Sequence, residues 1–244
     1  MCVPEIEGVI RRRLLINFRA QPEVVQQLLP ATFAPKVYRG WSIVGICLIR
    51  LEEIRPVGFP RFVGMASDNA AHRIAVTWQE PGDVREGVYI PRRDTNSCLN
   101  HLAGGRLFPG EHNLAEFHGT DDGGHISISI RSSDGSMRVE VEGQQTDEFP
   151  SNSIFPSLTA SSEFFAAGSV GYSATRDCCR FDGIRLDTTQ WTVAPLCMSK
   201  VESSFFGDRQ RFPANSIEFD HALIMRDIPH RWVSEPEITS RALV

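Results

Sequence analysis

The chain has very little lysine and no long apolar segment. Only Lys36 and Lys200 carry a side-chain amine among its 244 residues, so covalent chemistry on lysine is restricted to two positions. The longest apolar run, residues 43–51, contains Arg50 and is far shorter than the roughly 18–20 residues that span a bilayer. The N-terminal residues include Glu5 and lack the apolar core of a signal peptide. The default expectation is a cytoplasmic protein without a membrane partner.

The six cysteines occur without a CxxC pair. Cys178 and Cys179 are adjacent, and adjacent residues on a strand point to opposite faces. That spacing suits neither a zinc site nor an ordinary disulfide. We therefore expect buried free thiols, with vicinal redox chemistry as the alternative, and neither a structural metal nor a cofactor.

The charge balance is mildly acidic, with a formal net charge of -5, 41% hydrophobic residues and 23% charged residues. Such a composition is ordinary for a globular chain that buries a core. It argues against a nucleic-acid partner. The one basic run, Arg11 to Arg13, precedes Leu14 and is interpreted as the polar start or edge of a strand. Because no linker or internal repeat is evident, one domain over residues 1–244 is expected.

Alternating side chains predict a mainly antiparallel β protein. Ile126, Ile128 and Ile130 alternate with polar residues between turn sequences at 121–124 and 133–136, which is typical of an antiparallel meander. Further strands are expected at residues 9–18, 42–51, 72–79, 87–90, 112–118, 137–141, 170–173, 179–186, 191–206 and 217–225. Short helices are expected at residues 21–29, 161–167 and from Asp94 or Thr95 to Gly104. This pattern indicates an α+β fold that is mainly antiparallel β and barrel-like.

Three segments resemble the acetoacetate-decarboxylase-like superfamily, specifically an uncharacterised bacterial branch of it. They are a strand-Arg-helix-Leu-Pro signature at residues 15–30, the stretch from Gly87 through Asp94 to Phe108, and residues 162–165 with the later Trp191. The resemblance implies a cone-shaped antiparallel β-barrel with a few short helices and a closed, mostly apolar pocket. It also implies that a homo-oligomer is possible.

The resemblance also shows what is missing. The decarboxylases carry an aromatic-Pro-Lys-Lys turn, in which the first lysine forms a Schiff base and the second lowers its pKa. The matching turn here reads Phe108, Pro109, Gly110 and Glu111. Lys36 is expected in a surface turn and Lys200 on a strand, so Schiff-base decarboxylation is not expected.

Arg19 stands where the superfamily places a pocket arginine that meets a substrate carboxylate, which a guanidinium binds with two hydrogen bonds. The alternative is an exposed strand-end arginine or a structural ion pair. The family also has a pocket carboxylate on the strand before His72. The matching position is Asn69, although a shift of one residue would place Asp68 there.

Glu111 and His112 are the candidate replacement for the lysine chemistry. If residues 112–118 form a strand, His112, Glu116 and His118 share one face and would supply general acid and base groups, or metal ligands. The alternative is a solvated strand face with Ala115 packed inward.

Three further residues complete the expected ligand-binding set. Tyr89 and Arg92, or its neighbour Arg93, would line the mouth of the pocket, unless the arginine pairs with Asp94. Trp191 would be a ligand platform or part of the core.

These residues leave two main functions open. The first is a pocket protein that binds a small organic acid through Arg19 without covalent chemistry. The second is a lysine-independent lyase, hydrolase or isomerase for a small carboxylic acid, with Glu111 or His112 as acid or base. A structural protein with a filled pocket is a third possibility, and fold resemblance alone does not decide among them.

Overall fold

The computed structural model describes residues 5–103, 109–175 and 179–239, and most of them belong to one thirteen-stranded sheet. The strands are β1 (Ile6–Ala20), β2 (Ala34–Pro35), β3 (Val37–Tyr38), β4 (Trp41–Pro56), β5 (Met65–Glu80), β6 (Asp83–Thr95), β7 (His112–Asp122), β8 (His125–Ser132), β9 (Arg138–Gln145), β10 (Val170–Ala174), β11 (Arg180–Asp187), β12 (Ala194–Ser203) and β13 (Ile217–Thr239). The described helices are α1 (Pro22–Gln26), the 3-10 turn η1 (Arg61–Val63), α2 (Cys98–Ala103) and α3 (Leu158–Ala167). None of them is long and apolar enough to cross a membrane.

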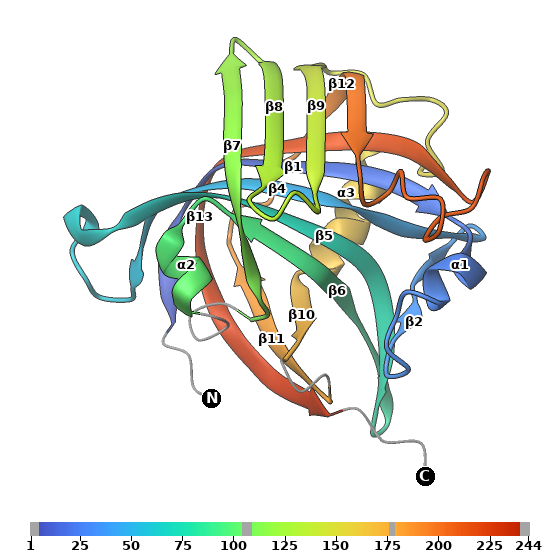
Figure 1. Cartoon of the computed structure of the whole chain (residues 1–244), viewed down its shortest axis with the longest axis horizontal. Coiled ribbons are helices and arrows are strands. Elements are labelled where there is room, and N and C mark those ends of the chain that lie inside the picture. Colours follow the sequence, from blue (N-terminus) through green and yellow to red (C-terminus); the bar gives the residue numbers. More distant parts are fainter. Residues whose placement is uncertain (1–4, 104–108, 176–178, 240–244) are drawn as a thin grey trace.

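The long strands are neighbours in one sheet, and two groups of shorter strands each connect its first long strand with its last, so that the sheet closes on itself. Strands β13, β1, β4, β5 and β6 are neighbours in that order, and β10 and β11 join β6 back to β13. Strands β7, β8, β9 and β12 make a second connection from β6 to β13 and stand upright above the long strands in Figure 1. Most pairs are antiparallel, but β6 runs parallel to both β7 and β10.

Most of the predicted strands are present, and the meander of β8 and β9 is confirmed. The turn that joins them contains Gly135 with a φ of 71°, a conformation that glycine adopts without strain. The predicted start of the second helix is wrong. Asp94 and Thr95 still belong to β6, where Asp94 lies opposite Ala70 of β5, and α2 begins only at Cys98. Its expected end, Gly104, lies outside the described residues.

The strands β1, β4 and β5 are buried on both faces. On one face, Leu14 and Ile16 belong to a core that includes Ile128 of β8. On the other face, Leu15 packs in a core with Phe165 of α3. We call these the strand-covered face and the helix-covered face. A strand buried on both sides needs apolar side chains on both, which explains the nearly continuous apolar run in β4.

The cysteines do not all behave as expected. Of the described cysteines, only Cys47 is buried, whereas Cys98, Cys179 and Cys197 are exposed. The prediction of burial is therefore wrong for these three. Cys98 begins a surface helix and Cys197 takes an outward position in the alternation of β12. Cys2 and Cys178 lie outside the described residues.

His72 is an unusual member of the strand-covered face. Its side chain is fully buried, neither ring nitrogen has a hydrogen-bond partner, and the ring packs 4.6 Å from that of Phe205. Burial, together with the positive charges of Arg92 and Arg211, lowers the pKa of His72 to about 3. The imidazole is therefore neutral in the folded protein at neutral pH.

We expect His72 to make folding sensitive to acid. Below pH 6.5 the unfolded chain binds a proton at this residue that the folded chain rejects, so stability falls as the pH drops from 6.5 toward 3. Between pH 7 and pH 5 the loss is about 2 kcal/mol. Urea unfolding at both pH values should show a smaller loss in His72→Leu and an unchanged loss in His118→Leu, which alters an exposed side chain. An equal loss in His72→Leu and the unmodified protein would contradict the assignment.

Candidate functional site

Three arginines and one cysteine gather on the helix-covered face. In the strand register, Cys47 of β4 lies opposite Ala71 of β5, and Ala71 lies opposite Arg93 of β6. Arg13 of β1 and Arg73 of β5 take diagonal positions next to Cys47. Arg13 Nε lies 3.1 Å from Cys47 Sγ and donates a hydrogen bond to it. We call Arg13, Arg73 and Arg93 the arginine cluster.

The arginine cluster is short of negative charge. None of its three guanidinium groups forms an ion pair with a carboxylate among the described residues, and Arg13 Nη1, Arg73 Nε and Arg93 Nη2 are buried atoms without a hydrogen-bond partner there. Burial lowers the pKa of Arg73 to about 10 and that of Arg93 to about 10. Arg13 adds repulsion at Arg73. Buried cations are normally paired, so this cluster is arranged for an anion.

A chain of buried polar groups holds Arg73 in place. Its Nη2 donates to Asn17 Oδ1, and Asn17 Nδ2 lies 3.0 Å from His221 Nε2. His221 Nδ1 lies 2.6 Å from Asp220 Oδ2. Because the amide of Asn17 must donate to Nε2, the proton of His221 is on Nδ1 and is donated to Asp220. Arg19 continues the chain, with Nη1 3.1 Å from Asp220 Oδ1.

Both titratable groups of this chain are shifted. Burial lowers the pKa of His221. For Asp220, burial acts to raise the pKa, but hydrogen bonds from His221, Ser153 and the backbone of Ile154 outweigh it and the pKa is lowered. The pair is therefore a neutral imidazole against a carboxylate at neutral pH.

Ser161 gives this chain the outline of a hydrolase triad. Its Oγ lies 2.7 Å from His221 Nε2, on the opposite side from Asp220. Ser161 is fully buried in α3 and borders none of the clefts described below. A nucleophile needs room for a substrate, so the geometry favours a structural hydrogen bond that orients His221, and through Asn17 the guanidinium of Arg73.

An open cleft leads to the arginine cluster from outside. It has a volume of about 470 Å³ and is lined by residues that include Tyr89, Arg92, Arg93, Gly110, Glu111 and Ser173. Arg93 donates from Nε to Ser173 Oγ in this cleft, 3.2 Å away, while its Nη2 is buried. Arg93 thus joins the cleft to the rest of the cluster.

Gly110 shapes the wall of the cleft. Its φ is 81°, and a Cβ atom placed on it would lie 2.6 Å from Ser173 Cβ and 3.7 Å from Arg93 Nε. Any side chain at this position would have to displace β10. Gly110 therefore lies beside Arg93, and its backbone approaches β10 too closely for a side chain such as lysine.

A second cavity, of about 30 Å³ and more enclosed than the open cleft, is lined by residues that include Arg13, Arg73 and Phe165. Lys36 also borders it, which the expectation of a surface turn did not include. The Lys36 amine lies 2.9 Å from a Glu86 oxygen and 4.2 Å from the centre of the Phe164 ring. One lysine of the chain is thus near the cluster, with its amine engaged by a carboxylate.

The residues predicted from the sequence divide into two groups. Tyr89, Arg92, Gly110 and Glu111 all line the open cleft. Arg92 also forms an ion pair with Asp94, in which Nη2 lies 2.8 Å from Oδ1. This is the ordinary ion pair that the sequence offered as the alternative for Arg92.

Arg19 and Asp68 lie away from the cleft. Arg19 is paired with Asp220 and with Glu218, 2.5 Å away, as the alternative of a structural ion pair expects. Asp68 alternates with Asn69 along β5 and is bound 2.7 Å from Arg50 Nη1. Asn69 shares its face with Ala71 and therefore with the cluster, as the unshifted alignment expects.

Trp191 lies against the arginine cluster from another segment. The Arg13 guanidinium is 5.5 Å from the centre of its ring, and its Nε1 donates to Ser162 Oγ. It also packs against the apolar core, as one of the two expectations for this residue has it, and a role as ligand platform stays a prediction.

Strand β7 separates the candidate acid and base groups. His112 is buried, and burial together with the charge of Arg93 lowers its pKa to about 3. Glu116 and His118 are exposed at the surface, with Ala115 packed inward, as the alternative of a solvated face expects. Among the described residues, no group of three or more His, Cys, Asp or Glu side chains is arranged to hold a metal.

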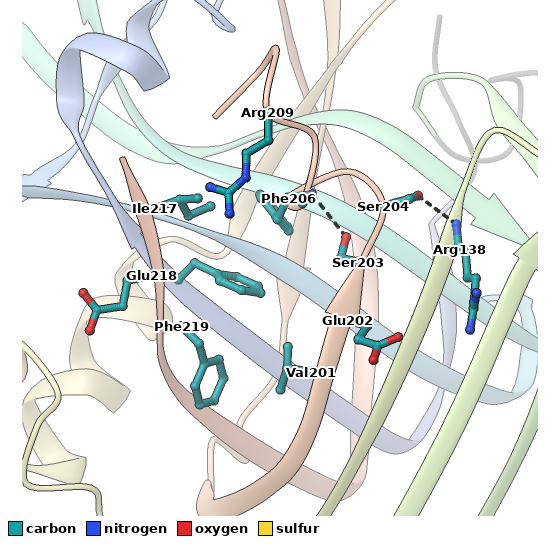
Figure 2. A pocket seen from close by; sticks show the side chains of 12 residues that line it. Arg138, Val201, Glu202, Ser203, Ser204, Phe206, Arg209, Ile217, Glu218 and Phe219 are labelled. Carbon is teal, nitrogen blue, oxygen red and sulfur yellow. Dashed lines mark hydrogen bonds between the residues drawn. The ribbon is translucent and has the colours of Figure 1, made fainter. Parts of the chain in front are cut away.

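A further pocket of about 490 Å³ lies on the strand-covered side, between β12, β13 and the loop after β12 (Figure 2). Its floor is apolar, with Phe18, Phe206 and Phe219. Charged residues at its edge are largely matched, since Arg138 pairs with Glu140 and Glu218 pairs with Arg19. Among the described residues, the buried guanidinium groups without carboxylate partners are therefore at the arginine cluster and not in this pocket.

Sequence reasoning missed Arg13 and Arg73 as site residues. A usable signal existed: Arg73 is the one charged residue other than His72 between Ala71 and Val76, and Arg13 directly precedes the buried Leu14. A charged residue inside a strand that is otherwise apolar on both faces must be compensated. The sequence does not tell which other strand supplies the neighbours.

The chain matches one protein family in sequence and several solved structures in fold. The model of the DUF2071 family, an uncharacterized conserved protein, matches residues 9–224. No match was found among curated proteins. The structure is similar to acetoacetate decarboxylase from Legionella pneumophila, with 12% identity, a TM-score of 0.61, and 96% of this chain and 88% of that chain covered.

Two other solved structures are similar. An acetoacetate decarboxylase-like enzyme from Sphingomonas wittichii RW1 has 12% identity and a TM-score of 0.60, with 99% and 95% of the two chains covered. The enduracididine biosynthesis enzyme MppR complexed with pyruvate has 8% identity and a TM-score of 0.54, with 98% and 91% covered. These likenesses confirm the expected acetoacetate-decarboxylase-like fold with its few short helices.

We expect the unmatched charge to cost stability when no anion is bound. Arg93→Met removes a buried cation and fills a similar volume, so the free energy of unfolding of the ligand-free protein should rise by about 1–3 kcal/mol. Urea unfolding measures it. Arg131→Met, which alters an exposed arginine of β8, should change stability by less than about 0.5 kcal/mol. A loss of stability in Arg93→Met would mean that this arginine serves the fold.

Proposed function

Because the chain belongs to the DUF2071 family and has the acetoacetate-decarboxylase-like fold, we propose that it binds a small organic anion at the arginine cluster. The observation that carries this proposal is the set of buried guanidinium groups of Arg13, Arg73 and Arg93 without carboxylate partners, next to an open cleft. A carboxylate would accept from the unpaired N–H groups and would offset the cost of burying the positive charge.

The shape of the site favours a small ligand. Arg93 lines the cleft of about 470 Å³, Arg13 and Arg73 line the cavity of about 30 Å³, and Gly110 leaves the cleft wall bare. The related enzyme MppR is complexed with pyruvate, a small 2-oxo acid, which makes pyruvate the natural first probe. Direct contact between Arg19 and the ligand stays a prediction. Its present contacts favour an indirect role, in which Arg19 holds Asp220 and so the chain that positions Arg73.

We expect pyruvate to raise the melting temperature of the protein and to bind saturably in calorimetry, because a ligand that binds only the folded state stabilises it. Arg93→Met should weaken binding about 10- to 100-fold, the effect of losing hydrogen bonds between charged groups. Arg131→Met should bind as the unmodified protein does. If neither pyruvate nor acetate binds to well-folded protein, the anion site is refuted.

Glu111 favours a second candidate function, an enzyme that removes a proton next to the ligand's carbonyl group. Glu111 is exposed and lines the same cleft as Arg93. A ligand bound in this cleft would therefore be near the Glu111 carboxylate. His112 is a weaker base because its pKa is lowered to about 3. This candidate is the lysine-independent lyase or isomerase expected from the sequence.

For this second candidate, we expect the protein to exchange the methyl protons of pyruvate for deuterium in D₂O, faster than buffer does. Glu111→Gln should reduce the exchange rate at least about 100-fold while pyruvate still binds, because the amide cannot accept the proton. Proton NMR follows the loss of the methyl signal. Exchange that persists in Glu111→Gln would assign the base elsewhere, and no exchange in the unmodified protein would leave the binding function alone.

A further inference from the structure

Cys47 is set apart from the other described cysteines by its surroundings. It is 3% exposed, whereas Cys98, Cys179 and Cys197 lie at the surface. Arg13 donates a hydrogen bond to its Sγ, and Arg73 and Arg93 both interact electrostatically with it. A thiolate is the nucleophilic form of cysteine, and cationic neighbours are the surroundings in which reactive cysteines are found.

A second observation points to an anion site beside this sulfur. Arg73 is 4% exposed, and its Nε has no hydrogen-bond partner among the described residues. Arg13 Nη1 is likewise buried and unpartnered, although Arg13 Nε is occupied by Cys47. The more enclosed cavity is lined by both of these arginines. A carboxylate that satisfies their free N–H groups therefore lies next to the Cys47 thiol.

The other nucleophiles near the arginine cluster are blocked. Lys36 borders the more enclosed cavity, but its amine is held 2.9 Å from Glu86. Position 110 is a glycine that has no room for a side chain. Ser161 is hydrogen-bonded to His221 and borders none of the pockets described above. The hydroxyl of Ser173 accepts a hydrogen bond from Arg93, which leaves Cys47 as the thiol that the described residues place at the cluster.

We propose that Cys47 is a nucleophile that adds reversibly to the carbonyl carbon of a small 2-oxo acid held by the arginine cluster. In this step a bond forms between Sγ and the carbonyl carbon, the carbon–oxygen double bond becomes a single bond, and the thiol proton ends on that oxygen. The product is a hemithioketal, and no oxidant or other reactant is consumed. The proposal rests on the proposed anion-binding function and names its substrate class.

The arrangement gives each group one part of this step. The carboxylate of the ligand pairs with Arg73 and Arg13, which fixes the carbonyl carbon near Sγ. Arg93, the third cation near the sulfur, stabilises negative charge that develops on the carbonyl oxygen during addition. The chain from Asn17 to Asp220 keeps Arg73 oriented, so that the ligand approaches in one geometry.

The first test compares two alkylating reagents of nearly equal size, the anion iodoacetate and the neutral iodoacetamide. The folded protein is treated with each, and mass spectrometry of peptides measures labelling at Cys47 and at the exposed Cys197 of the same molecules. We expect the ratio of iodoacetate to iodoacetamide labelling to be at least about tenfold higher at Cys47 than at Cys197. Arg73→Gln should lower the ratio at Cys47, and Arg131→Gln should leave it unchanged.

Two results of this test would overturn the proposal. Equal ratios at Cys47 and Cys197 would mean that no anion is held beside the sulfur. Labelling of Cys47 only after unfolding would mean that small molecules do not reach it. Pyruvate binding that still depends on Arg93 in calorimetry would, in either case, leave the proposed function standing and remove only the role of Cys47.

The second test detects the adduct itself. Pyruvate labelled with ¹³C at its carbonyl carbon should give, with the unmodified protein, a new NMR signal of a tetrahedral carbon bonded to oxygen and sulfur. Cys47→Ala should lose this signal but still bind acetate, which has no carbonyl to attack. A signal that persists in Cys47→Ala, or a carbonyl signal that never changes in the unmodified protein, would refute the addition. A borohydride-stable pyruvate adduct on Lys36 would assign the chemistry to the amine instead.

Discussion

The alternation of side chains along β1, β4 and β5 is the constraint on which the core and the candidate site both depend. The central parts of these strands are covered on both sides, so each residue there is committed to one of two buried environments. Leu14 belongs to the strand-covered core, and its neighbour Arg13 belongs to the arginine cluster. A slip of one residue would place a guanidinium in the apolar core and a leucine beside Cys47, so the register is strongly specified.

Burying the arginine cluster lowers the stability of the folded protein, and hydrogen bonds from the surrounding structure hold the cluster in place. An isolated buried cation favours water entry or a change of conformation, yet Arg73 is fixed by Asn17, His221 and Asp220 in a chain of hydrogen bonds that reaches Arg19. This rigid support uses part of Arg73 and leaves its Nε free. Groups that are costly for the folded state and held rigidly are typical of binding and catalytic sites.

Local patterns in the sequence predict the strands well, because alternation is a property of neighbouring residues. They predict the site less well, because its members come together through pairing between distant strands. Tyr89, Arg92, Gly110 and Glu111 are expected at the site because they lie in or beside the segment that resembles the superfamily. Arg13 and Arg73 belong to β1 and β5, and Lys36 reaches the same cavity from the segment between β2 and β3.

The boundaries of α2 were missed for a related reason. Asp94 is a good helix cap by composition, but its backbone is paired with β5 and its side chain is bound by Arg92. Pairing of β6 with β5 thus overrides the local preference of Asp94 for a helix cap. Only the three-dimensional structure shows this pairing.

The backbone at Gly110 affects both which nucleophile the site can hold and how the site binds an anion. Gly110 lies next to Arg93, and its φ of 81° and its approach to Ser173 belong to the backbone. Placing a lysine there would therefore require a movement of β10 and not only a change of side chain. The same close approach brings Ser173 against Arg93 and orients that guanidinium. The backbone geometry that excludes an amine nucleophile thus supports an anion site, and any covalent chemistry has to come from another wall of the site.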